Sequence, residues 1–406
     1  MQILDCTLRD GGYYTNWDLN AETVDAYIQA MNGLPIVYLE LGYRNNPLKE
    51  YNGKFGYCPL SVLKHIRENS KQKLAVMLNE KSTKPEDLEK LIAPLKGVVD
   101  MIRMAVDPKN LERAALLAEK VKEYGFEVAF NVMYMSKWDQ YEGLFEKLPR
   151  LNGTVKIFNM VDSYGSVTPE EVKAIIAKLK RYLTCQIGFH GHNNLQLGLI
   201  NTLTAIECGV DSVDATILGM GRGADNLNME LLLTYLNKHA GLKVNFNELG
   251  DAIQTFQPLY EKYRWGTSLP YMISGANFFP QKEVMDWVSN RVYSFNSIVR
   301  ALDNKKDKKE DNAKYPVLEV PKKYKQVLVI GGGNTVAEHI EAIHEFLQKN
   351  SLLCYQRHVM QNCSSDVNNQ CTIALWVMKA RGTYMKSLTP TIYRNLFVVS
   401  IYQLLD

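Results

Sequence analysis

Short apolar runs alternate with amphipathic segments along the first 240 residues of the chain. A run of this kind between polar or glycine residues is typical of a buried strand, and apolar side chains spaced three and four residues apart indicate a helix. Eight runs are predicted to be strands, namely residues 3–8, 36–41, 73–78, 99–104, 126–133, 155–161, 185–189 and 212–218. The chain therefore contains eight predicted strand–helix units.

Several of the predicted helices have recognisable start signals. Thr83–Glu86 offers a hydroxyl cap followed by a glutamate, Asp107–Pro108 offers a carboxylate cap with a first-turn proline, and Thr168–Glu171 has the capping-box pattern. Arg9–Gly12, after the first strand, is predicted to be a turn because its glycines permit one. Further helices are predicted over residues 20–33, 61–69, 138–148, 195–207 and 226–237.

Alternation of strands and helices implies parallel strands joined by right-handed crossovers. Eight units in about 240 residues fit an α/β fold of the (β/α)8 TIM-barrel type. A doubly wound open sheet is the alternative, although such a sheet normally uses fewer units. In a (β/α)8 barrel, functional side chains gather at the C-terminal ends of the strands.

Two histidines, His190 and His192, stand one residue apart at the end of the seventh predicted strand. Side chains at i and i+2 project from one face, so the two imidazoles could hold a metal ion or could each bond to the backbone. Asp10 follows the first strand. In a closed barrel, only the eighth strand lies between the first strand and the seventh. Asp10 could therefore complete a face of three ligands with open positions beside it. Its alternative role is a local ion pair with Arg9.

The overall composition agrees with an ordinary globular protein and changes this interpretation little. The net charge of +3 does not indicate a nucleic-acid or membrane partner, and no run reaches the length of a transmembrane helix. The seven cysteines include no Cys-x-x-Cys pair, so neither a disulfide framework nor a cysteine zinc site is indicated. The N-terminus has a strand pattern instead of a signal peptide. We expect a cytoplasmic protein with reduced thiols.

Three motifs resemble those of the DRE-TIM metallolyases. This superfamily contains hydroxymethylglutaryl-CoA lyase, the isopropylmalate and homocitrate synthases, and 4-hydroxy-2-oxovalerate aldolase. The motifs are TLRDG at residues 7–11, HGHN at 190–193 and GMGRGADN at 219–226, in the family's order and at strand ends. The longer run HGHNNLQLG at 190–198 looks most like the oxovalerate aldolase branch.

The resemblance implies a metal site and a reaction. Asp10, His190 and His192 would bind a divalent metal, with Mn²⁺ or Mg²⁺ expected first and Co²⁺ or Zn²⁺ as alternatives. Asn226 matches an asparagine that approaches the metal in some members, and Arg9 would stabilise an enolate oxygen. This assignment is chemically reasonable, because cleavage next to a 2-oxo acid leaves an enolate whose charge a metal and a guanidinium can share.

Tyr13 departs from the aldolase pattern. That branch usually carries a histidine, the general base, three residues after the metal-binding aspartate. A phenol is a poor base at neutral pH, because its ordinary pKa is near 10. Tyr13 could instead donate a proton, or a metal-held hydroxide could replace the base, or the substrate could differ. The remaining interpretation is a residue of the pocket wall.

Three further polar residues at strand ends are candidate substrate contacts. Ser163 belongs to an Asp-Ser pair that resembles the pair lining the pocket in this family, and Asn131 and Arg103 end two other strands. For Arg103 the alternative is an ion pair with Glu40 inside the barrel mouth, in a supporting role.

Beyond residue 240 the signals are weaker. Residues 241–302 are predicted to form an aromatic-rich helical extension that could also mediate homo-oligomer contacts, and residues 303–324 a charged linker. Residues 325–350 have the pattern of a partial α/β unit with a possible nucleotide-phosphate turn. Residues 351–406 contain only two acidic residues, and their periodicity fades. We interpret them as an atypical, poorly ordered tail that follows an interruption of the second domain near Asn350, for example by a change of reading frame.

Together these observations predict a divalent-metal-dependent aldolase that cleaves or forms a carbon–carbon bond next to a small 2-oxo acid. One alternative is a Claisen-type acyl-CoA transferase that uses the same site. Another is a barrel that has lost its activity and serves as a binding module. The presence of Arg9, Asp10, His190 and His192 argues against a loss of activity.

Overall fold

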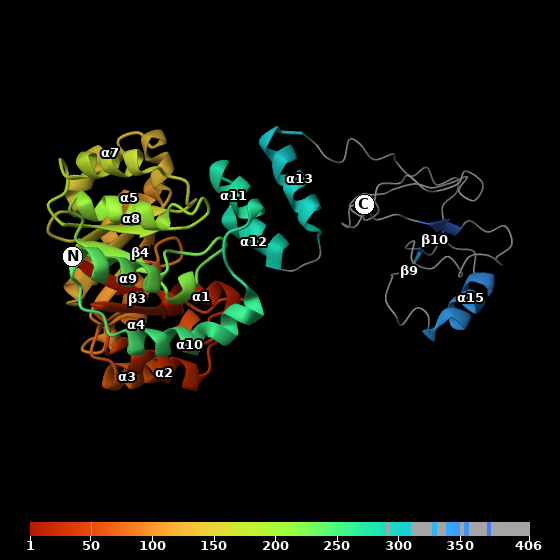
Figure 1. Ribbon diagram of the computed structural model, residues 1–406, viewed down its shortest axis with the longest axis horizontal. Coiled ribbons are helices and arrows are strands. Elements are labelled where there is room, and N and C mark those ends of the chain that lie inside the picture. Colours follow the sequence, from red (N-terminus) through yellow and green to blue (C-terminus); the bar gives the residue numbers. More distant parts are fainter. Residues whose placement is uncertain are drawn as a thin grey trace. The chain divides into compact units, whose positions relative to one another are not determined.

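The computed structural model describes residues 1–49, 51–289, 293–309, 327–330, 338–349, 353–356 and 372–374. The chain divides into two compact units, residues 1–289 and residues 290–406. Figure 1 shows the elements of both units. No helix in the described ranges is long and apolar enough to cross a bilayer.

The first unit contains a closed barrel of eight parallel strands, which confirms the predicted (β/α)8 fold and excludes the open sheet (Figure 1). The strands are β1 (Gln2–Asp5), β2 (Tyr38–Tyr43), β3 (Lys73–Asn79), β4 (Met101–Val106), β5 (Glu127–Val132), β6 (Ile157–Asp162), β7 (Gln186–Gly191) and β8 (Ser212–Ala215). β8 pairs with both β7 and β1. The first and seventh strands are therefore separated by one strand, as expected.

Helices surround the barrel and bury their apolar faces against it. They are α1 (Thr7–Thr15), α2 (Ala21–Met31), α3 (Leu60–Asn69), α4 (Leu88–Leu91), α5 (Leu111–Glu123), α6 (Leu144–Lys147), α7 (Pro169–Leu179), α8 (Gly198–Glu207) and α9 (Met229–Ala240). In α7, Val172, Ile176 and Leu179 recur at helical spacing and are buried, so this amphipathic face packs into the core.

Two of the predicted helix starts are confirmed. The hydroxyl of Thr168 accepts a hydrogen bond from the Glu171 amide at 3.3 Å, and the Glu171 carboxylate accepts one from the Thr168 amide at 2.7 Å. Asp107 likewise caps the short 3-10 helix η4 (Pro108–Asn110), which leads into α5.

Two other helix predictions are wrong. The segment after Thr83 begins at Pro85 as the 3-10 helix η2 (Pro85–Asp87), continues as α4 and stops before η3 (Ala93–Leu95), where Pro94 has no amide proton to continue a helix. Residues 138–148 do not form one helix either. They are divided among η5 (Met135–Gln140), α6 and η6 (Leu148–Leu151), because Gly143 takes a left-handed conformation in between.

The predicted turn at Arg9–Gly12 is also wrong, because this segment lies inside α1. Gly11 and Gly12 do not form a turn; they are needed because other side chains pack closely against them. A Cβ atom on Gly11 would lie 2.5 Å from the sulfur of Met220, and one on Gly12 would lie 2.0 Å from the indole ring of Trp17. The two glycines thus allow α1 to pack closely against its neighbours at the end of β1.

Three more helices belong to the first unit: α10 (Phe246–Tyr263), α11 (Leu269–Ala276) and α12 (Gln281–Ser289). The segment after α10 reaches the β8 loop, where the Trp265 indole donates to the Leu218 carbonyl at 2.7 Å. The Asn194 amide, just after β7, donates to the Tyr271 carbonyl at 2.9 Å and to the Gln281 side chain at 2.8 Å. The helical extension therefore holds the loops that follow β7 and β8.

The second unit contains α13 (Phe295–Lys306) and a parallel sheet. The sheet has the order β11 (Thr372–Ala374), β10 (Leu353–Gln356), β9 (Val327–Ile330), and α15 (Ile340–Lys349) lies between β9 and β10 in the chain. β9 and α15 are the strand and helix predicted within residues 325–350, whereas β10 and β11 fall within the predicted tail. The glycine turn at 331–333, most of the linker, the proposed interruption at Asn350 and the rest of the tail lie outside the described residues.

Candidate functional site

Three side chains predicted to bind a metal meet at the C-terminal end of the barrel strands. Asp10 projects from α1, and His190 and His192 lie at the end of β7; all three are buried. Nε2 of His190 lies 3.6 Å from a carboxylate oxygen of Asp10, and the two imidazole centroids are 5.0 Å apart. The fold therefore brings together residues that are 180 positions apart in the sequence.

Both histidine rings are held by their Nδ1 atoms. Nδ1 of His190 lies 2.9 Å from the Asp214 carboxylate, and Nδ1 of His192 lies 2.8 Å from the Asp162 carbonyl oxygen. Because a carbonyl oxygen only accepts, Nδ1 of His192 carries the proton and Nε2 carries the lone pair. Bonds of this kind to a carboxylate and a carbonyl orient the histidine ligands of metal sites.

Asn226 adds a second feature that fits a cation. Its side-chain amide donates to Asp10 at 2.7 Å, and its backbone forms an isolated bridge with His192. Its Oδ1 atom is buried and has no hydrogen-bond partner among the described residues. An unpaired buried oxygen beside a carboxylate requires an explanation, and a bound cation provides one. The side chains present thus fit a divalent metal.

A buried network of ion pairs surrounds this group. Arg9 pairs with Asp10 and, through Nε, with Glu40 at 2.8 Å. Arg103 is fully buried and pairs with the same Glu40 oxygen at 2.9 Å and with Asp214 at 2.5 Å. The ion pair between Glu40 and Arg103, expected as an alternative, is therefore present. Arg103 is held between two carboxylates.

The network sets the protonation states of the acidic groups. Burial alone would raise the pKa of Asp10, but the charge of Arg9, with further contributions from the two imidazoles and the Asn226 hydrogen bond, outweighs it and holds the pKa below its ordinary value. Burial also opposes ionisation of Asp214, yet Arg103 and His190 lower its pKa to about 2. Burial, together with the charges of His190 and Arg222, lowers the pKa of His192 to about 3. The group thus combines ionised carboxylates with a neutral His192.

Tyr13 lies in an aromatic cluster with Tyr43 and Trp17, one helical turn after Asp10 in α1. Its hydroxyl is 3.2 Å from the Tyr43 hydroxyl, and its ring packs edge-on against Trp17 with centroids 5.0 Å apart. Trp17 is fixed in turn by a hydrogen bond from its indole to the Arg9 carbonyl at 2.8 Å. Burial and the neighbouring Tyr13 raise the pKa of Tyr43 well above its ordinary value. Tyr43 is therefore a neutral phenol.

The other candidate substrate contacts are buried and bonded to neighbours. The Asn131 side-chain oxygen accepts from Asn159 at 3.2 Å, and the Ser163 hydroxyl accepts from the Tyr134 amide at 2.9 Å. Within the described residues, neither side chain forms a hydrogen bond with Asp10, His190 or His192. The structure thus places them at strand ends, as expected, without joining them to that group.

The sequence interpretation missed two neighbours of the site. Asp214 occupies an apolar strand, and an acidic residue at such a position needs a buried cation, a signal that could have been used. Cys6 lies 3.8 Å from Asp10 and, with His190 and Asp214, offers ligand atoms within 4.8 Å of one another. Asp214 and Nδ1 of His190 are already bonded to each other, so these atoms are less available to a metal than those that face Asp10.

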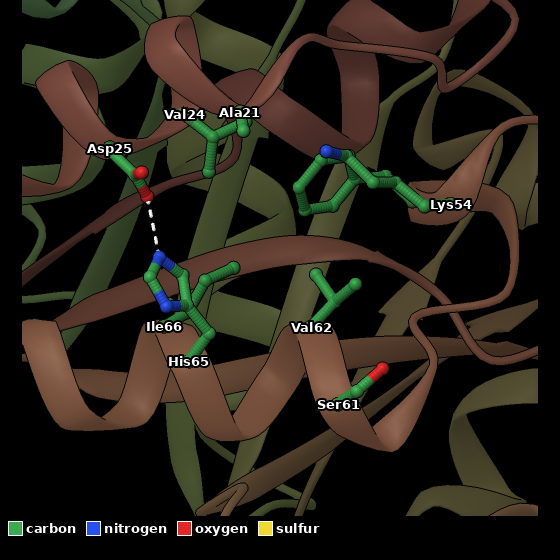
Figure 2. A pocket seen from close by; sticks show the side chains of 9 residues that line it. Ala21, Val24, Asp25, Lys54, Ser61, Val62, His65 and Ile66 are labelled. Atoms are coloured by element: carbon green, nitrogen blue, oxygen red, sulfur yellow. Dashed lines mark hydrogen bonds and ion pairs between the residues drawn. The ribbon is translucent and has the colours of Figure 1, made fainter.

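A separate cavity of about 270 Å³ lies on the outer layer of helices (Figure 2). Its lining comes from α2, α3 and the 3-10 helix η1 (Lys54–Gly56), and it includes an ion pair between His65 and Asp25 at 2.8 Å. None of the candidate site residues lines this cavity. The strand ends remain the candidate active site.

Comparisons with known proteins identify relatives of this chain. Residues 96–255 match the HMGL-like family model. A 4-hydroxy-2-oxovalerate aldolase of Geobacillus thermodenitrificans is 32% identical over 247 residues, which cover 59% of this chain and 70% of that enzyme. An oxaloacetate decarboxylase of Mycobacterium tuberculosis is 26% identical over 264 residues, which cover 62% of this chain and 75% of that enzyme.

A solved structure matches more strongly. The crystal structure of the N-terminal domain of a candidate aldolase from Bacteroides vulgatus shares 64% sequence identity with this chain. The match has a TM-score of 0.71 and covers 74% of this chain and all of that domain. The similarity thus extends through the barrel and beyond it.

Proposed function

The chain belongs to the HMGL-like family and is a divalent-metal-dependent carbon–carbon lyase, and we propose that it acts on a small 2-oxo acid as an aldolase. One observation carries the proposal. Asp10 and the two histidines converge at the barrel mouth, and each imidazole is held by its Nδ1 atom. The relatives are lyases, which favours cleavage over the acyl-transfer alternative.

Asp10, His190 and His192 are the proposed metal ligands, with Asn226 as a further ligand through its unpaired Oδ1. Carboxylate, amide and imidazole donors suit Mn²⁺ or Mg²⁺, and Co²⁺ or Zn²⁺ are the alternatives. When bound, such a metal would act as a Lewis acid toward the keto oxygen of the substrate.

Arg9 is proposed to stabilise negative charge as the bond breaks. In the cleavage direction, the electron pair of the bond passes to the 2-oxo fragment, which becomes an enolate. Nε of Arg9 is held by Glu40 and Nη1 by Asp10, while Nη2 forms no hydrogen bond with the described residues. A pre-oriented guanidinium with a free donor can bind the developing oxyanion without reorganisation.

Tyr13 is proposed to donate a proton to the reacting fragment. The cleavage reaction ends when the enolate carbon gains a proton, and the reverse reaction begins when that proton is lost. The hydrogen bond with Tyr43 fixes the position of the Tyr13 hydroxyl, and the charges of Arg9 and Asp10 act on Tyr43. A fixed phenol is suited to proton donation.

Ser163 and Asn131 stay proposed substrate contacts. Arg103, enclosed by Glu40 and Asp214, fits a supporting role better than direct contact. The cytoplasmic location and homo-oligomer formation through the helical extension also stay predictions.

Proton exchange of the pyruvate methyl group, followed by NMR in D₂O, tests the proposal. We expect the full chain to catalyse exchange with Mn²⁺ and not after chelation, because exchange requires reversible enolate formation. Metal binding without exchange would instead favour acyl transfer or a barrel that has lost its activity.

A further inference from the structure

Arg222 lies at the barrel mouth, and none of the described residues provides it with a counter-ion. It follows β8 in the loop between η7 (Ile217–Gly219) and α9, and it is partly buried. Its guanidinium carbon is 5.6 Å from the centroid of the Tyr13 ring. No carboxylate within the described part of the chain forms an ion pair with it. A cation withdrawn from water in this way gains stability when an anion binds beside it.

The charge of Arg222 also acts at the end of β6. Burial raises the pKa of Tyr164 to about 12, and Arg222 opposes this rise. Tyr164 directly follows Ser163 at the end of β6. The guanidinium therefore contacts Tyr13 and also acts electrostatically on Tyr164.

A second cation approaches the same tyrosine. Nζ of Lys137, in η5 after β5, lies 4.9 Å from the centroid of the Tyr164 ring and 3.5 Å from its hydroxyl. Lys137 also has no carboxylate partner among the residues the structure describes. The acidic group that acts on Tyr164, Asp107, already pairs with Lys81 at 3.3 Å. Lys137 thus contacts the Tyr164 ring, and Arg222 acts electrostatically on the same tyrosine from the loop after β8.

We propose that Arg222, together with Lys137, binds an anionic group on the fragment that leaves or joins as the aldehyde. This inference rests on the proposed aldolase function and narrows its substrate class to 2-oxo acids that carry a second carboxylate or a phosphate. A guanidinium recognises either group through paired hydrogen bonds. Cation–π contact with Tyr13 orients the guanidinium without neutralising it.

The reaction balances without any other reactant. In the synthetic direction, pyruvate loses a methyl proton, and the resulting enolate carbon attacks the aldehyde carbon. The new carbon–carbon bond takes the enolate electron pair, and the carbonyl oxygen of the aldehyde gains a proton to become a hydroxyl. The anionic group of the aldehyde takes no part in bond changes. It contributes binding, so its effect should fall mainly on KM.

Matched aldehydes test this specificity with the full chain, Mn²⁺ and pyruvate. Succinic semialdehyde is compared with butanal for a carboxylate, and glycolaldehyde phosphate with glycolaldehyde for a phosphate. We expect kcat/KM to be at least tenfold higher for the anionic member of one pair, and that pair identifies the group. Arg222→Met should bring the ratio of kcat/KM for the anionic aldehyde to that for the neutral aldehyde close to one, chiefly through KM. Arg222→Lys should retain part of the preference for the anionic aldehyde.

Arg150→Met provides the matched control. Arg150 lies in η6 and pairs with Glu119 at 3.6 Å, so its loss should leave the ratio unchanged. Equal kcat/KM values for charged and neutral aldehydes in the wild type, or an unchanged ratio in Arg222→Met, would overturn the inference.

Two further measurements separate this inference from the proposed function. Pyruvate exchange without aldehyde tests the aldolase chemistry alone, so its absence refutes that function. Calorimetric binding of 2-oxoglutarate and 2-oxopentanoate, which differ by one carboxylate, tests the anion site without turnover. At least tenfold tighter binding of 2-oxoglutarate, lost in Arg222→Met, supports a carboxylate site. If binding is equal and neither aldehyde pair shows a preference, the inference fails even where exchange occurs.

Discussion

The Asp214 carboxylate lies 2.9 Å from Nδ1 of His190, while Nε2 of the same ring lies 3.6 Å from Asp10. One imidazole thus has a carboxylate on each side. Asp214 is itself held by Arg103, whose guanidinium also binds Glu40. Because each member is buried, the orientation of His190 depends on a network that extends across β2, β4 and β8.

Replacing Asp214 with Asn should weaken metal binding. The neutral amide is a weaker acceptor than the carboxylate for the protonated nitrogen of His190, and mutation of such a partner typically lowers metal affinity by about 10–100-fold. Titration calorimetry with Mn²⁺ measures the change. Stability should fall as well, because Arg103 keeps only one carboxylate partner in a buried site.

Glu40→Gln separates the two effects. It removes the other carboxylate from Arg103 but leaves the bond between Asp214 and His190 intact. We expect a comparable loss of stability with a smaller loss of Mn²⁺ affinity. Equal losses of affinity in both variants would show that the charge network, and not the contact with His190, controls binding.

His192→Ala should abolish stabilisation by Mn²⁺. At a free concentration of 100 times Kd, one-site binding adds about 2.7 kcal/mol to the free energy of unfolding, which raises the melting temperature. The control is His65→Ala, because His65 lies on the outer helix α3 and pairs with Asp25 (Figure 2). A Mn²⁺-dependent rise in melting temperature that persists in His192→Ala, or that disappears in His65→Ala, would contradict the proposed ligand set.

The barrel and its metal-binding candidates could be predicted, because both depend on local patterns. Apolar runs mark the strands, and the i, i+2 spacing of His190 and His192 marks a shared strand face. The helix α1 could not be predicted. Gly11 and Gly12 disfavour a helix locally, and the close packing against Met220 and Trp17 that requires glycine at both positions is visible only in the structure.

The partners of the site depend on contacts between distant segments. Asp214 meets His190 from the neighbouring strand and Arg103 across the barrel, so no spacing rule connects these residues. Arg222 lies within a recognised motif, yet the reason to propose an anion-binding role for it appears only in three dimensions, where no carboxylate of the described residues pairs with it. Candidate metal ligands can therefore be predicted from the sequence more easily than the residues that orient them.

Tyr13→Phe should slow pyruvate exchange while Mn²⁺ binding persists. A positioned proton donor or acceptor typically contributes about 10²–10⁴-fold to the rate. Tyr43→Phe keeps the Tyr13 hydroxyl but removes its partner at 3.2 Å, so a smaller loss is expected. Tyr13→His, which introduces an imidazole at this position, should retain exchange. An unchanged rate in Tyr13→Phe would instead identify Tyr13 as a wall residue.

The Asp5 carboxyl should make stability fall as the pH rises. Asp5 ends β1 and accepts hydrogen bonds from the Thr7 amide at 2.8 Å and the Tyr27 hydroxyl at 2.5 Å. Burial nevertheless raises its pKa to about 7, so the folded state holds a proton that the unfolded state releases near pH 4. The free energy of unfolding then loses about 1.4 kcal/mol for each pH unit between pH 4 and 7.

Asp5→Asn removes this titration while keeping a similar shape. Urea unfolding at pH 5, 6, 7 and 8 measures the free energy of unfolding of the wild type and of the variant. The wild-type value minus the variant value should fall steadily up to pH 7 and then level off. Asp139→Asn, an exposed substitution beside Lys178, should show no such trend. If the difference for Asp5→Asn is constant from pH 5 to 7, Asp5 is already ionised in the folded barrel, and its three hydrogen bonds, including the one from the Thr7 hydroxyl at 2.9 Å, outweigh its burial.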